Sequence, residues 1–222
     1  MIAAGRAAPR RSLPLRTLVL VVVAAALVGT AGGVLLHRLR ASAAPAAPSL
    51  PELHGQAVWA AGVRPAPAFA LRDQRGVLVS LGALRGRPVL LTFLDSQCHS
   101  ACPIAGRQLA SVLRRLPAAT RPTLVVVSVD PKGDTRAGIE RAMHAWGLAG
   151  PWRWHWLNAT RTRLASVWRS YGIAVQPTSN DIKHGLPLYL IDRRGYERTA
   201  YLFPFLPAFV QGDLARLARE RT

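Results

Sequence analysis

The chain has 222 residues, half of them hydrophobic, and its formal net charge at pH 7 is +18. Six basic residues flank one uncharged run near the N-terminus, and all 11 acidic residues lie beyond that run. The remaining basic residues, nearly all arginines, are scattered singly, without the basic stripe and interleaved aromatic residues of a nucleic-acid-binding protein. The excess charge therefore indicates a solvated surface, or one attracted to anionic lipid or to an acidic partner.

The uncharged run covers residues 17–36 and is about long enough to cross a bilayer as a helix. Four arginines precede it within residues 1–16, which predicts a cytoplasmic N-terminus and an extracytoplasmic remainder. We therefore predict a single-pass protein of the cell membrane, anchored through this transmembrane helix. A cleaved signal segment is the alternative, because Ala41-Ser42-Ala43 has the small-x-small form of a cleavage site.

Residues 37–66 are rich in Ala and Pro with little periodicity, which predicts a tether. One domain is expected over residues 67–222. At its start, Phe69–Leu71 and Val77–Leu81 flank a turn that contains glycine, as in a β-hairpin. The apolar run from Pro88 to Leu94 then predicts a strand buried on both faces.

The two cysteines of the chain, Cys98 and Cys102, follow that strand directly and precede a helical pattern that begins after Pro103. A helix start offers unpaired N–H groups and a partial positive charge, which favour an ionised sulfur. Their spacing allows the two sulfurs to close a disulfide or to grip one ion. The pair therefore predicts redox or soft-metal chemistry, with an inert structural disulfide as the alternative.

The rest of the chain predicts further strands and helices in alternation. Residues 123–129 form a second buried strand, Asp134 or Thr135 caps a helix, and Thr160 caps another. Residues 186–191 and 197–202 form a hairpin, and a closing helix follows. This order predicts an α/β fold, a thioredoxin-like sandwich with an N-terminal β-hairpin extension, in which the first strands pair parallel and the last two antiparallel.

Two other groups of residues have structural interpretations. Asp130 ends a strand before a proline and Asp134 can cap a helix, so neither needs a functional role. Trp152, Trp154 and Trp156 alternate, as on the core-facing side of a strand. The polar residues 180–183 predict a loop that moves when a metal or a partner arrives.

From about residue 67 to residue 218 the chain resembles the Sco/SenC family of membrane-anchored copper proteins with a thioredoxin fold. The resemblance rests on the two cysteines and the proline after them, on Ser128–Pro131, on Val167–Ile173, and on the histidine shortly before Leu188–Gly195. It implies that Cys98, Cys102 and His184 bind one copper ion, as Cu(I) or Cu(II). It also implies delivery of copper to the dinuclear centre of cytochrome oxidase, or reduction of its cysteines.

Donor chemistry favours the same three residues, because thiolates suit Cu(I) and an added imidazole completes a site that also holds Cu(II). His184 lies 82 residues beyond Cys102, so only the fold brings it to the thiols. The chain departs from the family pattern at His99, where proline is usual, and in the preceding residues 95–97. We interpret His99 as an exposed side chain, with a role as ligand or proton acceptor left open.

These observations favour a copper chaperone that passes its ion to a copper-accepting protein such as a cytochrome oxidase subunit. One alternative is a thiol–disulfide reductase, in which Cys98 and Cys102 act as a redox-active pair without metal. The other is a binding or sensing domain whose disulfide is only structural.

Overall fold

The computed structural model describes residues 15–42, 53–179 and 181–220. They form two compact units, one on each side of residue 50, which we describe separately. Residues 1–14 of the predicted basic N-terminus, residues 43–52 of the predicted tether with Ala43 of the cleavage motif, and Asn180 lie outside the described residues.

The first unit contains helix α1 (Leu15–Ser42). Among the residues that the structure describes, no helix combines the length and the apolar character needed to cross a membrane. The structure therefore does not support the predicted transmembrane helix over residues 17–36.

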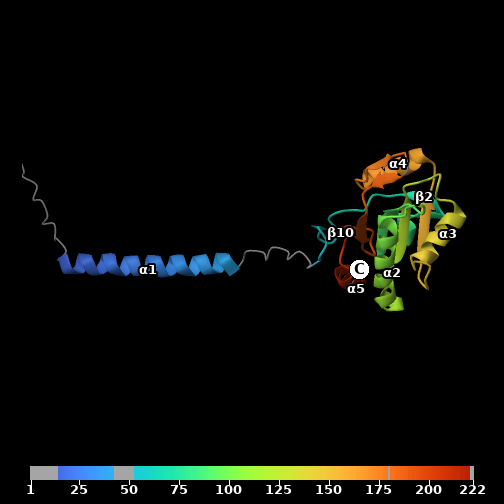
Figure 1. Cartoon of the computed structure of the whole chain (residues 1–222). Helices are drawn as coiled ribbons and strands as arrows, with labels where there is room; N and C mark the ends of the chain where they lie inside the picture. Colours follow the sequence, from blue (N-terminus) through green and yellow to red (C-terminus); the bar gives the residue numbers. More distant parts are fainter. Residues whose placement is uncertain (1–14, 43–52, 180, 221–222) are drawn as a thin grey trace, which may run out of the picture. The chain divides into compact units, whose positions relative to one another are not determined.

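The second unit, with the helices labelled α2 to α5 in Figure 1, is built around a sheet. The described strands of this sheet lie in the order β1-β10-β9-β4-β5-β6-β2-β3. In chain order these strands are β1 (Ala57–Val58), β2 (Ala70–Asp73), β3 (Leu78–Ser80), β4 (Val89–Leu94), β5 (Thr123–Ser128), β6 (Trp154–Asn158), β9 (Pro187–Ile191) and β10 (Glu197–Leu202). The parallel pairing of β4 with β5 and the antiparallel pairing of β9 with β10 confirm the prediction. A separate antiparallel hairpin consists of β7 (Val175–Pro177) and β8 (Ile182–His184).

Helices cover both faces of this sheet. On one face lie α2 (Ala101–Arg115), α3 (Arg136–Ala145) and α5 (Pro207–Arg219), and on the other lies α4 (Arg161–Ser170). The side chains of β4 alternate between the two layers, because Leu90 packs with the first group whereas Leu91 and Phe93 pack with the second. This double burial explains the continuous apolar run of β4 and confirms the predicted α/β sandwich.

Local sequence signals account for several element ends. Thr135 caps α3, since its side-chain oxygen accepts a hydrogen bond from the N–H of Gly138 (3.1 Å). Thr160 is the N-cap residue of α4 but makes no such bond. Two short 3₁₀ helices, at Leu81–Leu84 and Ala118–Thr120, lead into β4 and β5.

The folded domain begins earlier than the boundary predicted at residue 67. Leu53 is buried in the core, and β1 pairs with β10. Residues 53–66 therefore pack on the sheet instead of acting as a tether. Composition did not reveal this, because a two-residue edge strand leaves almost no periodic pattern.

Two further differences concern β6 and the β7–β8 hairpin. Trp156 is fully buried as predicted, whereas Trp152 and Trp154 are only partly buried. The predicted loop over residues 180–183 contributes Ile182 and Lys183 to β8. This strand has few buried side chains, so hydrophobic alternation could not mark it.

Candidate functional site

Cys98 and Cys102 lie where the chain leaves β4 and enters α2. Asp95 organises this turn: its carboxylate accepts the N–H of Gln97 (2.7 Å), and its carbonyl accepts the N–H of Cys98 (3.3 Å). Because α2 begins at Ala101, Cys102 lies in its first turn. Cys98 is partly buried and Cys102 completely buried, and both are free thiols. The predicted disulfide therefore gains no support from this structure.

A buried carboxylate, that of Asp134, holds the turn in place. Its two oxygens accept hydrogen bonds from the backbone N–H of Ser96 (2.8 Å) and from the indole N–H of Trp156 (2.9 Å). Burial raises the pKa of Asp134, and these hydrogen bonds act in the opposite direction. Asp134 thus joins the loop before Cys98 to β6 and to the start of α3. Of the two predicted candidates for the helix cap, Asp134 and Thr135, Thr135 provides it.

Asp130 shapes the neighbouring loop after β5. Its carboxylate accepts the N–H of Lys132 (3.3 Å), and the amide of Gln97 donates to the carbonyl of Gly133 (3.2 Å). A Cβ atom at Gly133 would lie 1.9 Å from a carboxylate oxygen of Asp130, so any other residue here would displace that carboxylate. Asp130 therefore has a structural role in the loop after β5, in line with the interpretation from its sequence.

The acidic groups around the thiols influence one another. Burial, followed by the negative charges of Asp134, Asp130 and Cys98, raises the pKa of Asp95 to about 6. The site therefore disfavours additional negative charge, and a bound cation would relieve this repulsion.

His184 reaches the thiols from the end of β8. Its Nε2 lies 3.9 Å from Cys102 Sγ, and its Nδ1–H donates to the carbonyl of Gly185 (2.8 Å). Because Nδ1 carries the proton, Nε2 is unprotonated, and its lone pair is free to bind a metal ion beside Cys102 Sγ. Burial lowers the pKa of His184, which favours the neutral imidazole that a metal requires. The fold thus brings together two of the predicted metal ligands.

The two thiols have opposite acid–base character. The pKa of Cys98 is lowered to about 4, mainly because the Cys102 thiol donates a hydrogen bond to it. The Ser100 hydroxyl, whose oxygen lies 3.5 Å from the Cys98 sulfur, lowers the pKa further. The hydrogen bond between the two cysteines, together with burial, raises the pKa of Cys102 above its ordinary value. Near neutral pH the pair therefore carries its negative charge on Cys98 and its proton on Cys102.

The described part of the chain contains no group of three or more His, Cys, Asp or Glu side chains arranged to hold a metal ion. Cys98, Cys102 and His184 are neighbours that have not converged on one coordination point. His99 is exposed, as predicted. Sequence reasoning missed the supporting contacts of Ser96 and Ser100, for which only the general enrichment of serine near helix starts offered a signal.

The chain is similar to a known protein family and to solved structures. The profile of the SCO1/SenC family matches residues 61–218. ScoI of Bradyrhizobium japonicum, solved with copper bound, is 27% identical, with a TM-score of 0.57, over 69% of this chain and 99% of that one.

Two other solved structures share the fold at lower identity. A SCO1/SenC family lipoprotein of Bacillus anthracis is 20% identical, with a TM-score of 0.61, over 70% of this chain and 96% of that one. BsSco, described as a member of the Sco family of cytochrome c oxidase assembly proteins with a disulfide switch, is 19% identical, with a TM-score of 0.58, over 71% of this chain and 95% of that one. No curated protein matches the chain.

The low pKa of Cys98 generates a prediction about thiol reactivity. In the reduced full-length chain, iodoacetamide should alkylate Cys98 at a rate nearly independent of pH between about pH 6 and about pH 8, because the thiolate is already formed. Buried Cys102 should stay unmodified. Cys102→Ala removes the main hydrogen-bond donor, so the Cys98 rate should fall at the lower pH and rise with pH. Mass spectrometry of the peptide that contains both cysteines measures the two rates.

His99→Ala is the matched control for this experiment. It changes an exposed residue beside Cys98 and should leave the pH profile unaltered. A wild-type rate that climbs about tenfold per pH unit over this range would contradict the assigned thiolate.

Proposed function

This chain belongs to the SCO1/SenC family, and from that membership we propose that its folded domain binds one copper ion and passes it to a copper-accepting protein, such as a subunit of cytochrome oxidase. The observation that carries this proposal is the approach of His184 Nε2 to within 3.9 Å of Cys102 Sγ from 82 residues away. A disulfide needs only two cysteines, whereas a histidine held beside them adds a third metal donor.

The donor set fits copper. Two thiolates are soft ligands that select Cu(I), and an imidazole in addition gives a site that tolerates both oxidation states. The hydrogen bond from Nδ1 of His184 to the Gly185 carbonyl fixes the ring so that Nε2 is the coordinating atom.

Copper affinity depends on pH, because the reduced cysteine pair holds one proton that copper must displace. Cys98 offers a thiolate at once, whereas Cys102 must release its proton before its sulfur becomes a full ligand. Copper binding therefore releases a proton, and copper affinity rises with pH. The nearby carboxylates of Asp95 and Asp134 favour the added positive charge.

The relatives support this assignment. ScoI of Bradyrhizobium japonicum carries copper in its solved structure, and BsSco is described among cytochrome c oxidase assembly proteins. By the same likeness we assign copper delivery to the present domain. The departures at His99 and residues 95–97 leave the proposed ligands Cys98, Cys102 and His184 in place.

Thiol–disulfide exchange is the second candidate function, and one observation favours it. An accessible cysteine of low pKa beside a buried, protonated one has the asymmetry of an attacking and a resolving thiol. The third alternative, a binding domain with a structural disulfide, is the weakest, because both cysteines are free.

We also propose that the domain works outside the cytoplasm, either held at the membrane or released after export. This proposal rests on the arginines before the uncharged run of residues 17–36.

The first prediction of this proposed function concerns copper binding itself. The reduced full-length chain should bind one copper ion, measured by competition with a chromogenic Cu(I) chelator. Cys98→Ser and Cys102→Ser should each abolish tight binding, and His184→Ala should weaken it by at least about tenfold. His99→Ala, the exposed histidine of the same region, is the control and should retain wild-type affinity. Stoichiometric copper in a variant that lacks both cysteines would sink the proposed site.

A second prediction separates copper transfer from thiol exchange in cells. If the site transfers copper, His184→Ala should reduce cytochrome oxidase activity about as much as loss of either cysteine. If the site exchanges disulfides, Cys102→Ser should trap a mixed disulfide between Cys98 and its partner, and His184→Ala should remain active. Normal oxidase activity in His184→Ala cells, with loss in the cysteine variants, would replace the copper proposal by the reductase.

A third prediction concerns location. A membrane-impermeant thiol reagent should label Cys98 in intact cells whose outer barrier is permeable, because the thiolate is partly exposed. Absence of labelling before cell lysis, with labelling afterwards, would refute an extracytoplasmic domain. A soluble product that starts near Ala44 would identify a cleaved signal segment in place of an anchor.

A further inference from the structure

Two cavities open at the amino ends of β4, β5 and β6, the end of these parallel strands opposite to the thiols. The larger, of about 480 Å³, is lined by Gln74, Arg75, Trp152, Arg153, Trp154 and His155. The smaller, of about 180 Å³, contains Arg87, Arg121 and the adjoining prolines. Trp152 and Arg153 line both cavities, so the two cavities adjoin at these residues and together make up one site.

The lining of this site is basic. Arg75, Arg153 and His155 line the larger cavity, Arg87 and Arg121 join Arg153 in the smaller one, and none of the lining residues is acidic. The buried Asp73 carboxylate offsets the charge of Arg75, so the attraction for oxyanions comes mainly from Arg87, Arg121 and Arg153. The forked guanidinium group of arginine matches the oxygens of phosphate, to which it donates two parallel hydrogen bonds.

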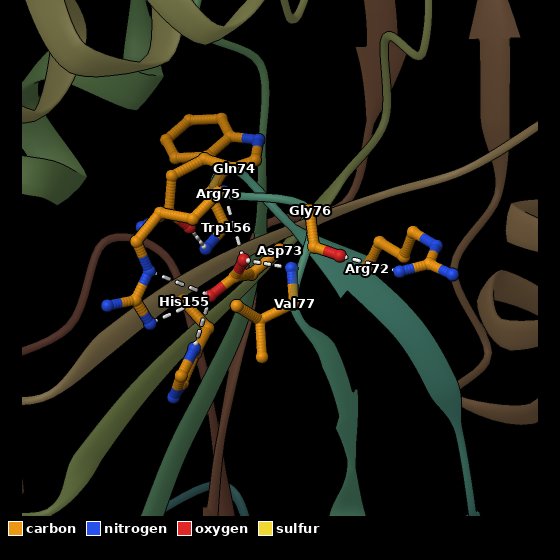
Figure 2. Close-up of polar contacts among 8 residues, drawn as sticks. All are labelled: Arg72, Asp73, Gln74, Arg75, Gly76, Val77, His155 and Trp156. Atoms are coloured by element: carbon orange, nitrogen blue, oxygen red, sulfur yellow. Dashed lines mark hydrogen bonds and ion pairs between the residues drawn. The ribbon is translucent and has the colours of Figure 1, made fainter.

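The wall of the larger cavity is held rigidly by a buried carboxylate (Figure 2). Asp73 accepts hydrogen bonds from the backbone N–H groups of Arg75 (2.9 Å) and Val77 (3.0 Å), and also from the Arg75 guanidinium (2.9 Å). His155 Nδ1 lies 3.0 Å from the same carboxylate. The amide oxygen of Gln74 accepts the backbone N–H of Trp156 (2.9 Å), which fastens this turn to β6.

Asp73 also determines which atom of His155 faces outward. Because an ionised carboxylate only accepts hydrogen bonds, Nδ1 carries the proton that it donates to Asp73. Figure 2 shows the other ring nitrogen turned away from Asp73. It makes no hydrogen bond to the described residues, so the outer side of the ring is free for a ligand.

Two donors at the shared part of the site lack partners. The Arg153 side chain is exposed and makes no hydrogen bond or ion pair with the described residues. The indole N–H of Trp152 is buried without an acceptor among them. An unsatisfied buried donor is costly, and a ligand oxygen would offset this cost once the half-buried Trp152 side chain turned its N–H toward the cavity. Arg121, whose guanidinium lies 5.8 Å from the Trp152 ring centre, is held nearby.

From these observations we propose that the site around Trp152 and Arg153 binds a phosphate group, either free or on the headgroup of an anionic phospholipid. An inorganic phosphate offers four acceptor oxygens, and a phosphodiester headgroup offers two charged non-bridging oxygens and two ester oxygens, enough for Arg153, a second arginine and an N–H donor together. A carboxylate offers only two. The site lies at the end of the sheet away from Cys98, so its ligand leaves the thiols open to a partner.

The test compares Arg153→Gln with a matched control in the full-length chain. Arg107→Gln is the control, because it removes the same charge from an exposed position on α2 outside both cavities. Calorimetric titration with inorganic phosphate forms the first arm. The second arm measures hydrogen exchange of residues 150–155 with vesicles of phosphatidylcholine, with and without phosphatidylglycerol.

Binding of one inorganic phosphate, weakened about tenfold or more by Arg153→Gln and within about twofold of wild type in Arg107→Gln, supports a site for free phosphate. Protection of residues 150–155 only by vesicles with phosphatidylglycerol, lost in Arg153→Gln but kept in Arg107→Gln, supports a headgroup site. Absence of both effects overturns the proposal. Equal losses in the two variants also overturn it, because they indicate non-specific attraction to net charge.

Discussion

The thiol site depends on one buried carboxylate. Asp134 accepts hydrogen bonds from Ser96 in the turn before Cys98 and from Trp156 in β6, and it directly precedes the cap of α3. Two segments that are distant in the chain therefore donate to one acceptor, which a third segment carries. Burying this group costs free energy, which its hydrogen bonds offset only in part, because the pKa of Asp134 is still raised. Without the carboxylate, a backbone N–H and an indole N–H would be left buried and unsatisfied.

Proton sharing between the two cysteines gives the site its chemical character. The same hydrogen bond stabilises the thiolate of Cys98 and the thiol of Cys102, so the pair is activated at one sulfur and protected at the other. Both proposed functions use this asymmetry. They also exclude one another at any moment, because copper and a disulfide would occupy the same sulfurs. His184 distinguishes them, because an imidazole beside Cys102 would contribute to a metal site and is not required to join two sulfurs.

The two ends of the parallel strands have different electrostatic environments. Asp95, Asp130 and Asp134 gather at the carboxyl ends with the thiols, whereas Arg87, Arg121 and Arg153 surround the cavities at the amino ends. When parallel strands are joined by helices, the loops that follow the strands all lie at one edge of the sheet and the loops that precede them at the other. Aspartates and arginines that alternate along the chain are therefore separated in space. The domain therefore keeps an anion-attracting surface apart from a site suited to a cation.

The sequence alone determined the features whose causes are local. The apolar run of β4 predicted a strand buried on both faces, the pair Asp134 and Thr135 predicted a helix cap, and the cysteines were correctly placed between strand and helix. Edge strand β1 and the β7–β8 hairpin escaped prediction, because short strands with few buried residues carry little periodic signal.

Only the tertiary structure decided the long-range contacts. It brought His184 Nε2 to Cys102 Sγ, tied Asp134 to Trp156, and gathered arginines from three separate loops around Trp152. The family resemblance named His184 as a ligand, but residue spacing could not place it beside the thiols. Such contacts depend on strand order, pairing and helix packing, which arise from the whole core and not from the residues on either side of any one position.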